Sequence, residues 1–488
     1  IKVVSLSLGL FLSIVLFARV AMELSYDTFY QGHQQLYFVQ TAWDFGKGGK
    51  PNIGNCLYPT GPTIMQHFPE QVESATVINS WWPIEFKHGE RIYDGDEFLA
   101  ADSLFFQTMG IPLLEGNAKD LGMPDVVFMS QSFAQEVFGS ENPTGKTILW
   151  NGKNEAIVKG IYADIPENNT FRGKAVLSMA SLDFRKDWHS GGSVSSVVRL
   201  KEGADMEFIN DRINLILENY IPMKDHYTKH AQATGIKVSL TPVDGYHLNI
   251  SNVQTMIYIM SLLAIVLLIS AAFNYALISI SSLSHRAKGI GVHKCCGAET
   301  GTIFGMFFWE TFFVVLLSVI VAVFFILNFQ AQLEEMLDTS VKSLFSWQNL
   351  WAPLLAIVTL FLIGCLLPGR LFSSIPVTQV FRRYTERKKH WKYPLLCIQF
   401  GGTAFLLGFV AVVFIQYRYV MHKDMGYDTH GLVYVNHSFS NPHNALTNLR
   451  NLPFVEGAEN ASTQIMNPMQ NLAVEDNNGN WKFTPRIH

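Results

Sequence analysis

The sequence contains five apolar runs that are each long enough to cross a membrane, and they constrain its fold more than any other feature. A spanning helix needs ~20 mostly apolar residues to cross a hydrocarbon core of ~30 Å. Hydrophobic residues make up 49% of the chain and charged residues only 16%, which favours a membrane protein over a soluble one. The runs cover residues 3–22, 256–280, 304–327, 351–372 and 395–415.

The first run is predicted to be a membrane anchor and not a signal peptide. It is longer than the apolar region of a signal peptide, and no small-residue cleavage site precedes the following ELSYD. The chain begins with Ile1 at the edge of this run and stops at His488 in polar sequence. We therefore expect the chain to be truncated at both ends.

Basic residues in the short loops predict how the helices are oriented. The loop between the second and third runs carries Arg286, Lys288 and Lys294 against Glu299. The loop between the fourth and fifth runs carries six lysines and arginines over residues 382–392, against one glutamate. Basic loops face the cytoplasm, and five alternating crossings place these two on the same side. The 230 or so residues after the first run are then extracytoplasmic.

This long insert, residues 24–254, is predicted to fold as an α+β domain, because a structureless loop of that length is implausible. Strand-like patterns occur in VESATVIN and PDVVFMS, and helical spacing of apolar residues in SFAQEVFG and DMEFINDRINLILENY. Asn151-Gly152 lies between two alternating segments and predicts a tight hairpin turn. The predicted fold is a membrane α-helical bundle with an α+β extracytoplasmic domain.

One segment of this domain, GSENPTGKT at 139–147, is similar to a phosphate-binding P-loop, G-x-x-x-x-G-K-[ST]. The first glycine position of that pattern falls on Ser140, because Gly139 is one residue too early. Pro143 also restricts the loop, and the segment leads into a predicted hairpin instead of a helix. We therefore predict a turn before a strand, and no nucleotide bound by this chain.

The sequence shows no catalytic or metal-binding pattern. It contains neither G-x-S-x-G nor H-E-x-x-H, and its histidines are scattered. The five cysteines form no C-x-x-C pair and no zinc spacing with histidine. The net charge of −4 does not suggest nucleic acid as a partner. An enzymatic role is thus disfavoured.

A short pattern occurs twice in the chain. Tyr26-Asp27-Thr28 follows the first apolar run, and Tyr427-Asp428-Thr429 follows the fifth. In both cases a strand-like segment comes next. The repeat predicts a domain duplication, with a second unit that begins at the fifth helix.

The loop between the second and third apolar runs is the most informative segment. Residues 284–296 can form a short helix at the membrane surface, and Gly297 can end it, since glycine readily takes the left-handed cap conformation. A short helix held between two spanning helices would act as a rigid lever. A push on it would move both helices.

This loop resembles the MacB/FtsX-like permease family of ABC transporters, which carries R-x-x-E-I-G-[VI]-R-[KR]-x-x-G-A at this place. Gly289 and His293 depart from the pattern, since the family has Glu and Arg there. Further landmarks, among them ELSYDTF, FGSENPTGKTI, VKGIYADIPENNTF and IPVTQVFRR, extend the resemblance over most of the chain. The matching positions of the loop are Arg286, Ile290, Gly291, Val292, Lys294, Gly297 and Ala298.

The resemblance implies a division of the chain that starts with helix 1 (1–23) and a MacB-like periplasmic core domain (24–254). An FtsX-like unit with helices 2–4 follows (255–375), and it includes the coupling loop at 284–300. The remaining parts are a basic cytoplasmic linker (376–393), the fifth helix (394–420) and the start of a second extracytoplasmic domain (421–488).

The resemblance also implies a function. Such a chain is the permease subunit of an ABC transporter in the inner membrane, and it couples a separate cytoplasmic ATPase dimer to the outer domains by mechanotransmission. ATP is then bound by the partner and not by this chain. Expected contacts besides the ATPase are membrane lipid and a periplasmic adaptor or outer-membrane component, with no nucleic acid. The work would be export of peptides or drugs, or lipoprotein release.

Two alternatives remain open at this point. The chain could instead be an FtsX-like regulator that activates an extracytoplasmic hydrolase or signalling partner. Glu310, inside the third apolar run, could serve a proton relay or pack as an interfacial acid near the coupling loop, and the second role is favoured. Within that loop, Ile290 and Val292 are the expected apolar contacts with the ATPase, and Arg286 and Lys294 the charged ones.

Overall fold

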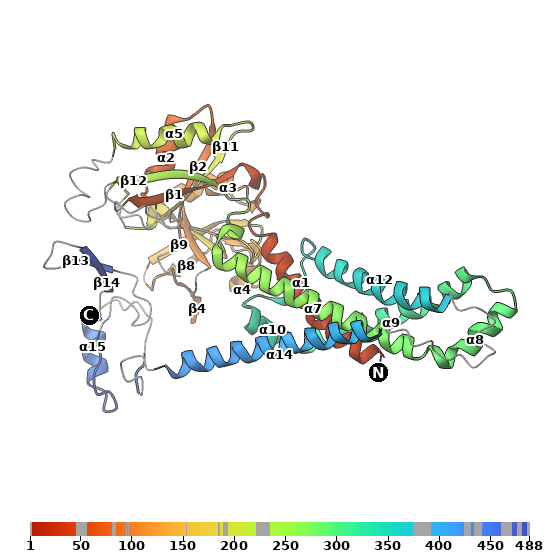
Figure 1. Ribbon diagram of the computed structural model, residues 1–488. Coiled ribbons are helices and arrows are strands. Elements are labelled where there is room, and N and C mark those ends of the chain that lie inside the picture. The colour runs from red at the N-terminus through yellow and green to blue at the C-terminus, as the bar shows by residue number, and fades with distance from the viewer. Residues whose placement is uncertain are drawn as a thin grey trace. The chain divides into compact units, whose positions relative to one another are not determined.

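The computed structural model contains a sheet domain attached to a bundle of long helices (Figure 1). One compact unit comprises Ile1–His226 and Ala233–Val410, and a second includes Ala411–His488; each is described by itself. The described residues are 2–44, 56–80, 84–93, 95, 97–152, 154–183, 186–188, 194–220, 235–373, 392–423, 431–433, 442–459, 471–475 and 481–485.

Within the described residues, five helices are long and apolar enough to cross a membrane. Each contains one of the five predicted apolar runs and extends a few residues beyond it, since polar residues can continue a helix outside the hydrocarbon. The helices are α1 (Lys2–Leu24), α7 (Ser251–Ser281), α9 (Thr300–Asn328), α12 (Trp351–Ser373) and α14 (Lys392–His422).

Helix α1 is the centre of the bundle that it forms with α7, α9 and α12. Its side chains Leu6, Leu10 and Ile14 are buried in one apolar cluster with residues from all three neighbours. Small residues let the helices approach closely, as is common in membranes. A Cβ atom added to Gly9 would lie only 2.7 Å from the Cβ of Ala271 on α7.

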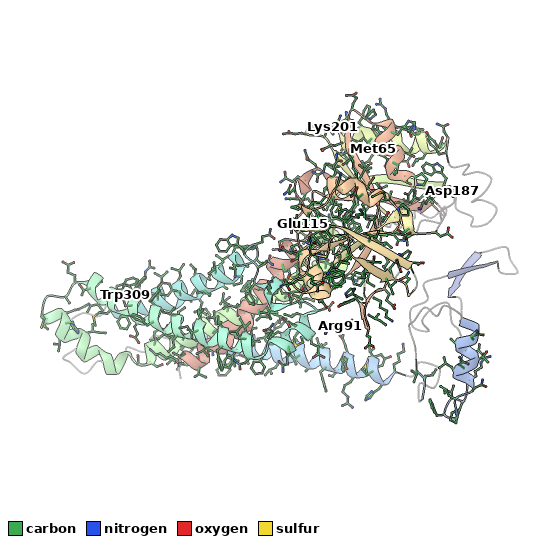
Figure 2. The ribbon with its side chains drawn as sticks, turned by 180° about the vertical axis from the view of Figure 1, so that it is seen from behind. Met65, Arg91, Glu115, Asp187, Lys201 and Trp309 are labelled. Atoms are coloured by element: carbon green, nitrogen blue, oxygen red, sulfur yellow. The ribbon has the colours of Figure 1, made fainter. Side chains whose placement is uncertain are left out.

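Three shorter helices lie next to the long ones. They are α8 (Leu283–Cys295), which connects α7 to α9, and α10 (Gln330–Leu337) and α11 (Val341–Leu344), which connect α9 to α12. Helix α8 lies at the end of the bundle away from the sheet domain, whereas α10 lies toward it (Figure 1). In the opposite view, Trp309 of α9 lies on the bundle, far from Lys201 and Glu115 of the sheet domain (Figure 2).

The described part of the sheet domain is built on a 12-stranded mixed sheet in the order β12-β1-β11-β2-β5-β10-β7-β9-β8-β3-β4, with β6 on β9. Only the pairs β5–β10 and β7–β9 are parallel. The strands are β1 (Leu36–Asp44), β2 (Val72–Asn79), β3 (Phe86–His88), β4 (Arg91–Tyr93), β5 (Phe98–Ala101), β6 (Leu113–Glu115), β7 (Val126–Ser130), β8 (Thr147–Trp150), β9 (Asn154–Tyr162), β10 (Ala175–Ser178), β11 (Ser195–Leu200) and β12 (Gly235–Pro242).

Helices and turns of this domain connect the strands and cover the sheet. The α-helices are α2 (Thr60–His67), α3 (Phe105–Met109), α4 (Gln131–Phe138) and α5 (Met206–Leu217), and the 3-10 turns are η1 (His33–Gln35), η2 (Ala118–Gly122), η3 (Met179–Ser181) and η4 (His247–Asn249). Together with the long helices, these elements confirm the predicted fold of a helical bundle with an α+β domain.

The predicted hairpin shows why the local sequence signals were sufficient. Strands β8 and β9 pair antiparallel, with Trp150 opposite Asn154. Asn151 and Gly152 both have positive φ, at 45° and 77°. Two consecutive left-handed residues are what a tight turn needs to match the twist of its strands, and Asn-Gly supplies them at low cost.

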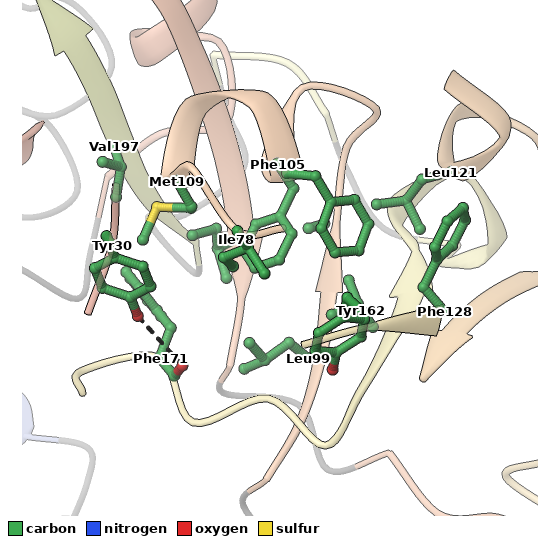
Figure 3. Close-up of a cluster of buried hydrophobic side chains, with 14 of the residues drawn as sticks. Tyr30, Ile78, Leu99, Phe105, Met109, Leu121, Phe128, Tyr162, Phe171 and Val197 are labelled. Atoms are coloured by element: carbon green, nitrogen blue, oxygen red, sulfur yellow. Dashed lines mark hydrogen bonds between the residues drawn. The ribbon is translucent and has the colours of Figure 1, made fainter. Parts of the chain in front are cut away.

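The main core of the sheet domain is aromatic (Figure 3). Phe105, Phe106 and Phe128 pack between α3 and the sheet. The two buried tyrosines keep a polar partner, because an unpaired buried hydroxyl would be costly. Tyr30 donates to the carbonyl of Phe171 at 3.4 Å, and Tyr162 donates to the carbonyl of Gly173 at 2.9 Å.

Strand β12 is an edge of the sheet, and helix α5 closes it with two amide side chains. Asn214 accepts from Val238 N at 2.8 Å and donates to Val238 O at 3.0 Å. Asn210 accepts from Leu240 N at 2.7 Å and donates to Leu240 O at 3.4 Å. Pro242, next in the same outward register, has no amide hydrogen. An open edge would invite pairing with another chain, and these contacts remove the opportunity.

The second unit contains α15 (Pro442–Arg450) and an antiparallel pair formed by β13 (Asn471–Glu475) and β14 (Trp481–Pro485). The predicted second copy of Tyr-Asp-Thr, at 427–429, lies outside the described residues. So does most of the basic linker predicted at 376–393.

The edge contacts generate a prediction about Asn210 and Asn214. Changing both to Leu removes four hydrogen bonds from β12 and exposes its outward backbone groups. At about 0.5–1.5 kcal/mol for each bond, we expect a loss of roughly 2–6 kcal/mol, together with self-association. Thermal unfolding and sedimentation of the full chain in detergent would measure both effects.

Asp211→Leu is the matched control, because it adds an exposed leucine to α5 without touching the edge. If this control self-associates as strongly as the double variant, added hydrophobicity and not the open edge is responsible.

Candidate coupling site at helix α8

Helix α8 is joined to α7 and to α9 by very short connections. Ser282 is at once the last cap of α7 and the first cap of α8. On the other side only four residues, Cys296 to Glu299, separate α8 from α9. A displacement of α8 must therefore reach both long helices.

The end of α8 is fixed by a Schellman cap. Gly297 has a φ of 93°, in the left-handed region. Its amide donates to the carbonyl of Lys294 at 3.1 Å, and the amide of Ala298 donates to the carbonyl of His293 at 2.9 Å. These two bonds satisfy carbonyls that a helix end would otherwise leave unpaired. Gly297 therefore ends the helix, as predicted.

The residues of α8 divide between two faces. Ile290 is 6% exposed and Gly291 is also buried, so this face packs inward. Val292 is 55% exposed and points away from the bundle. Of the two aliphatic residues expected to contact a partner, Val292 is the one that a partner can reach. The side chain of Arg286 lies outside the described residues.

Lys294 connects α8 to a third long helix. Its Nζ donates to the carbonyl of Ser373, the last residue of α12, at 2.8 Å. A lysine at the C-terminal end of a helix is favourable because the unpaired carbonyls there carry partial negative charge. The charge of Lys294 thus serves a contact within the chain, which the sequence motif alone did not indicate.

Glu310 is a half-buried residue of α9 that meets a basic side chain. It is the eleventh residue of α9, about 15 Å along the helix from its start. Its Oε1 accepts from Lys2 Nζ at 3.3 Å, and the same ammonium lies 5.6 Å from the ring centre of Tyr275. An acid at membrane depth needs such a partner. Lys2 lies 308 residues away, so no local pattern could have identified it.

Lys146, in the segment similar to a P-loop, is also engaged within the chain. Its ammonium pairs with the carboxylate of Glu141 and lies 5.2 Å from the ring centre of Phe138. The hydrogen bond and the charge of Lys146 lower the pKa of Glu141. The segment runs from α4 to β8, whereas a P-loop runs from a strand to a helix.

A family model matches the part of the chain that contains α8. Residues 261–377, from α7 to just beyond α12, match the family of FtsX-like permease C-terminal domains. This match confirms the resemblance inferred from the α8 motif. No curated protein matches the sequence.

Three solved structures are similar to part of the chain. A domain of a Porphyromonas gingivalis protein designated a permease has 19% identity and a TM-score of 0.37, and it covers 44% of this chain and 92% of that one. The periplasmic region of MacB from Actinobacillus actinomycetemcomitans has 18% identity and a TM-score of 0.32, with 45% and 93% covered. The extracellular domain of the noncanonic ABC-type transporter YknZ from Gram-positive bacteria has 11% identity and a TM-score of 0.29, with 41% and 98% covered. Because these TM-scores are low, the structural similarities carry no argument here. The family assignment rests on the match over residues 261–377.

Gly289, inside α8, and Gly297, just after its end, should respond in opposite directions to alanine. A Cβ at either Gly297 or Gly289 would meet no atom within 4 Å, so only the backbone decides. Gly297→Ala forces alanine into the left-handed region and should cost about 1–2 kcal/mol. Gly289→Ala replaces a glycine inside a helix and should stabilise α8 by about 0.5–1 kcal/mol. Hydrogen exchange of the α8 amides measures both, and equal effects would argue against the cap.

The pair Lys2–Glu310 can be tested by a double-mutant cycle. Lys2→Met leaves Glu310 without this partner, and Glu310→Gln removes its charge. We expect the double variant to lose less stability than the sum of the single variants, with a coupling of about 0.5–1.5 kcal/mol. Unfolding in mixed micelles would measure it. Strictly additive single effects would show that the pair contributes nothing.

Proposed function

Residues 261–377 belong to the FtsX-like permease C-terminal family, and from this premise we propose that the chain is the transmembrane subunit of an ABC transporter. Permeases of this family work with a cytoplasmic ABC ATPase. In the proposed arrangement, that ATPase docks on α8, the long helices cross the inner membrane, and the sheet domain lies outside the cytoplasm. ATP-driven motion then passes through the membrane without carriage along a central channel.

The construction of α8 is the observation that carries this proposal. It is capped at Gly297, joined directly to α7 through Ser282 and bonded to α12 through Lys294. A partner that moves α8 therefore moves several long helices together. Val292 gives that partner an exposed aliphatic contact at the end of the bundle away from the sheet.

ATP hydrolysis is assigned to the partner. The segment of this chain closest to a nucleotide motif has serine at its first glycine position, and its lysine already pairs with Glu141. We propose that the transported or released cargo meets the sheet domain outside the membrane. Peptides, drugs and lipoproteins are the cargo classes that the family resemblance suggests.

The test of this function is docking of an ABC ATPase at Val292. Val292→Asp places a charge in the apolar contact, and loss of a buried aliphatic contact costs about 1.5–3 kcal/mol, which is ~10–100-fold in affinity. We expect co-purification with the ATPase and stimulation of its activity to fall. Lys294→Ala should weaken the complex less, because its charge is used within the chain.

Because Val292 is exposed, a substitution there should not unfold the permease, so the result reports on docking alone. Thermal unfolding of the variant alone is the control. Undiminished complex yield for Val292→Asp would reject α8 as the docking site.

A further inference from the structure

The place where α1 leaves the bundle contains a cluster of buried polar side chains, which we call the helix–sheet junction. It combines the end of α1 and the turn after it (residues 19–28), a loop of the sheet domain (166–172), η4 just before α7, and residues 338–349 before α12. It lies at the opposite end of the bundle from α8 (Figure 1).

Glu23 is the hub of the helix–sheet junction, although it is only 3% exposed. One carboxylate oxygen pairs with the guanidinium of Arg19 at 2.6 Å, and the other lies 2.6 Å from Nε2 of His247. Arg19 also donates to the hydroxyl of Thr339 at 3.1 Å. A buried carboxylate is tolerated only with such partners. These contacts join α1 to η4 and to the segment before α11.

His247 is held on its other side by an aromatic ring. Its imidazole stacks on Tyr26, with ring centres 3.6 Å apart and planes 8° from parallel. The stack fixes the ring plane, so Nε2 points at Glu23 in one geometry. His247 begins η4, which ends at Asn249, two residues before α7 starts at Ser251. The imidazole therefore positions the start of α7 against the end of α1.

The turn after α1 binds the sheet domain through Asp27. Its carboxylate accepts from the amide of Thr170 at 2.7 Å and from the hydroxyl of Thr170 at 2.6 Å. Asp27 has a φ of 60°, which places its short side chain over the loop. Ser25 adds a contact of 2.7 Å to Asn349 and accepts from Asn168 at 2.9 Å. The junction thus connects three bundle elements to one loop of the sheet.

We propose that Glu23 and His247 form a proton-dependent joint, which fixes the sheet domain to α1 and α7 when His247 is charged and loosens when it is neutral. Histidine is the side chain that changes charge between pH 5 and 8. A charged imidazole makes a stronger, charge-assisted hydrogen bond to a carboxylate than a neutral one does. The joint is therefore tight in acid and looser in mild alkali.

Several charged and titratable groups lie around His247. They are Arg19 and Glu23 of α1, Tyr26 and Asp27 of the turn, and Arg172 of the loop, with Glu167 and Asp338 beyond Arg172. Arg19 and His247 share the single negative charge of Glu23. Asp27 is a second acidic group that interacts with His247.

Asp27 also makes the stability of the folded state depend on pH, and with the same sign. Burial raises the pKa of its carboxyl from 3.8 to about 6, against the hydrogen bonds from Thr170 that lower it. A carboxyl with a raised pKa in the folded state stabilises that state in acid. Its contribution is complete below about pH 4 and is lost as the pH rises through about 6. The experiment must separate Asp27 from His247.

Hydrogen exchange of the full chain in nanodiscs, corrected for the intrinsic pH dependence of exchange, tests the joint. Peptides over 246–254 and 25–30 report on it, and a peptide over α8 is the internal reference. In the wild type, exchange at the joint should be several-fold slower at pH 5.5 than at pH 8.5. His247→Gln, always neutral, should exchange faster than the wild type at pH 5.5 and keep only the smaller pH dependence that comes from Asp27. His247→Arg stays charged and can stack on Tyr26, so it should exchange more slowly than the wild type at pH 8.5 and also keep only the Asp27 dependence.

Two further variants complete the design. His67→Gln changes a histidine remote from the junction, paired with Tyr220, and should behave as the wild type. Asp27→Asn should keep a reduced pH dependence that comes from His247. The proposal is overturned if His247→Gln keeps the full pH dependence, or if Asp27→Asn alone abolishes it.

The role of the joint in coupling rests on the proposed function, but its existence does not. With an ABC ATPase bound, His247→Gln should leave complex yield unchanged and reduce the pH dependence of coupling between ATP use and cargo handling. If no ATPase docks on α8, the proposed function fails, while hydrogen exchange in the permease alone still decides the joint.

Discussion

Burial of α1 between three other helices is the constraint on which the rest of the structure depends. Its buried apolar residues pack against α7, α9 and α12, whereas Val4, Leu8 and Leu12 are exposed along one face. Close approach requires small residues at the contacts, as at Gly9 and Ala271. Once α1 is central, its two ends determine the polar chemistry of the bundle, with Lys2 meeting Glu310 at one end and Glu23 meeting His247 at the other.

Much of this fold follows from local sequence. The long helices could be predicted from apolar length, the hairpin from Asn151-Gly152, and the end of α8 from Gly297. Each of these features depends on a few neighbouring residues, whose propensities act regardless of the remainder of the chain. The order of strands in the sheet, by contrast, does not depend on neighbouring residues alone. Strand β1 pairs with β11 and β12, more than 150 residues later, and no periodicity records that choice.

The polar contacts that connect elements were equally hidden in the sequence. Asn210 and Asn214 are recognisable as an i, i+4 pair, but only the position of β12 makes them a cover for a sheet edge. Glu23 and His247 are 224 residues apart, and Ser25 and Asn349 are 324 apart. Sequence analysis of the coupling site identified the residues of α8 correctly as one element. It could not show that Ile290 is buried while Val292 is exposed, because that depends on packing against the bundle.

Helix α7 connects the helix–sheet junction with α8. It has 31 residues and is therefore about 47 Å long, well beyond a hydrocarbon core of ~30 Å. The structure describes every residue of the five long helices, and of these helices only α7 contains neither glycine nor proline. Kinks in helices arise mainly at such residues, and α12, for comparison, contains Pro368. A displacement applied at α8 would thus travel along α7 with little loss to bending. At the helix–sheet junction, one imidazole lies between the start of α7 and the end of α1. A joint at that position can regulate how far the sheet domain follows α7 without altering the lever at α8.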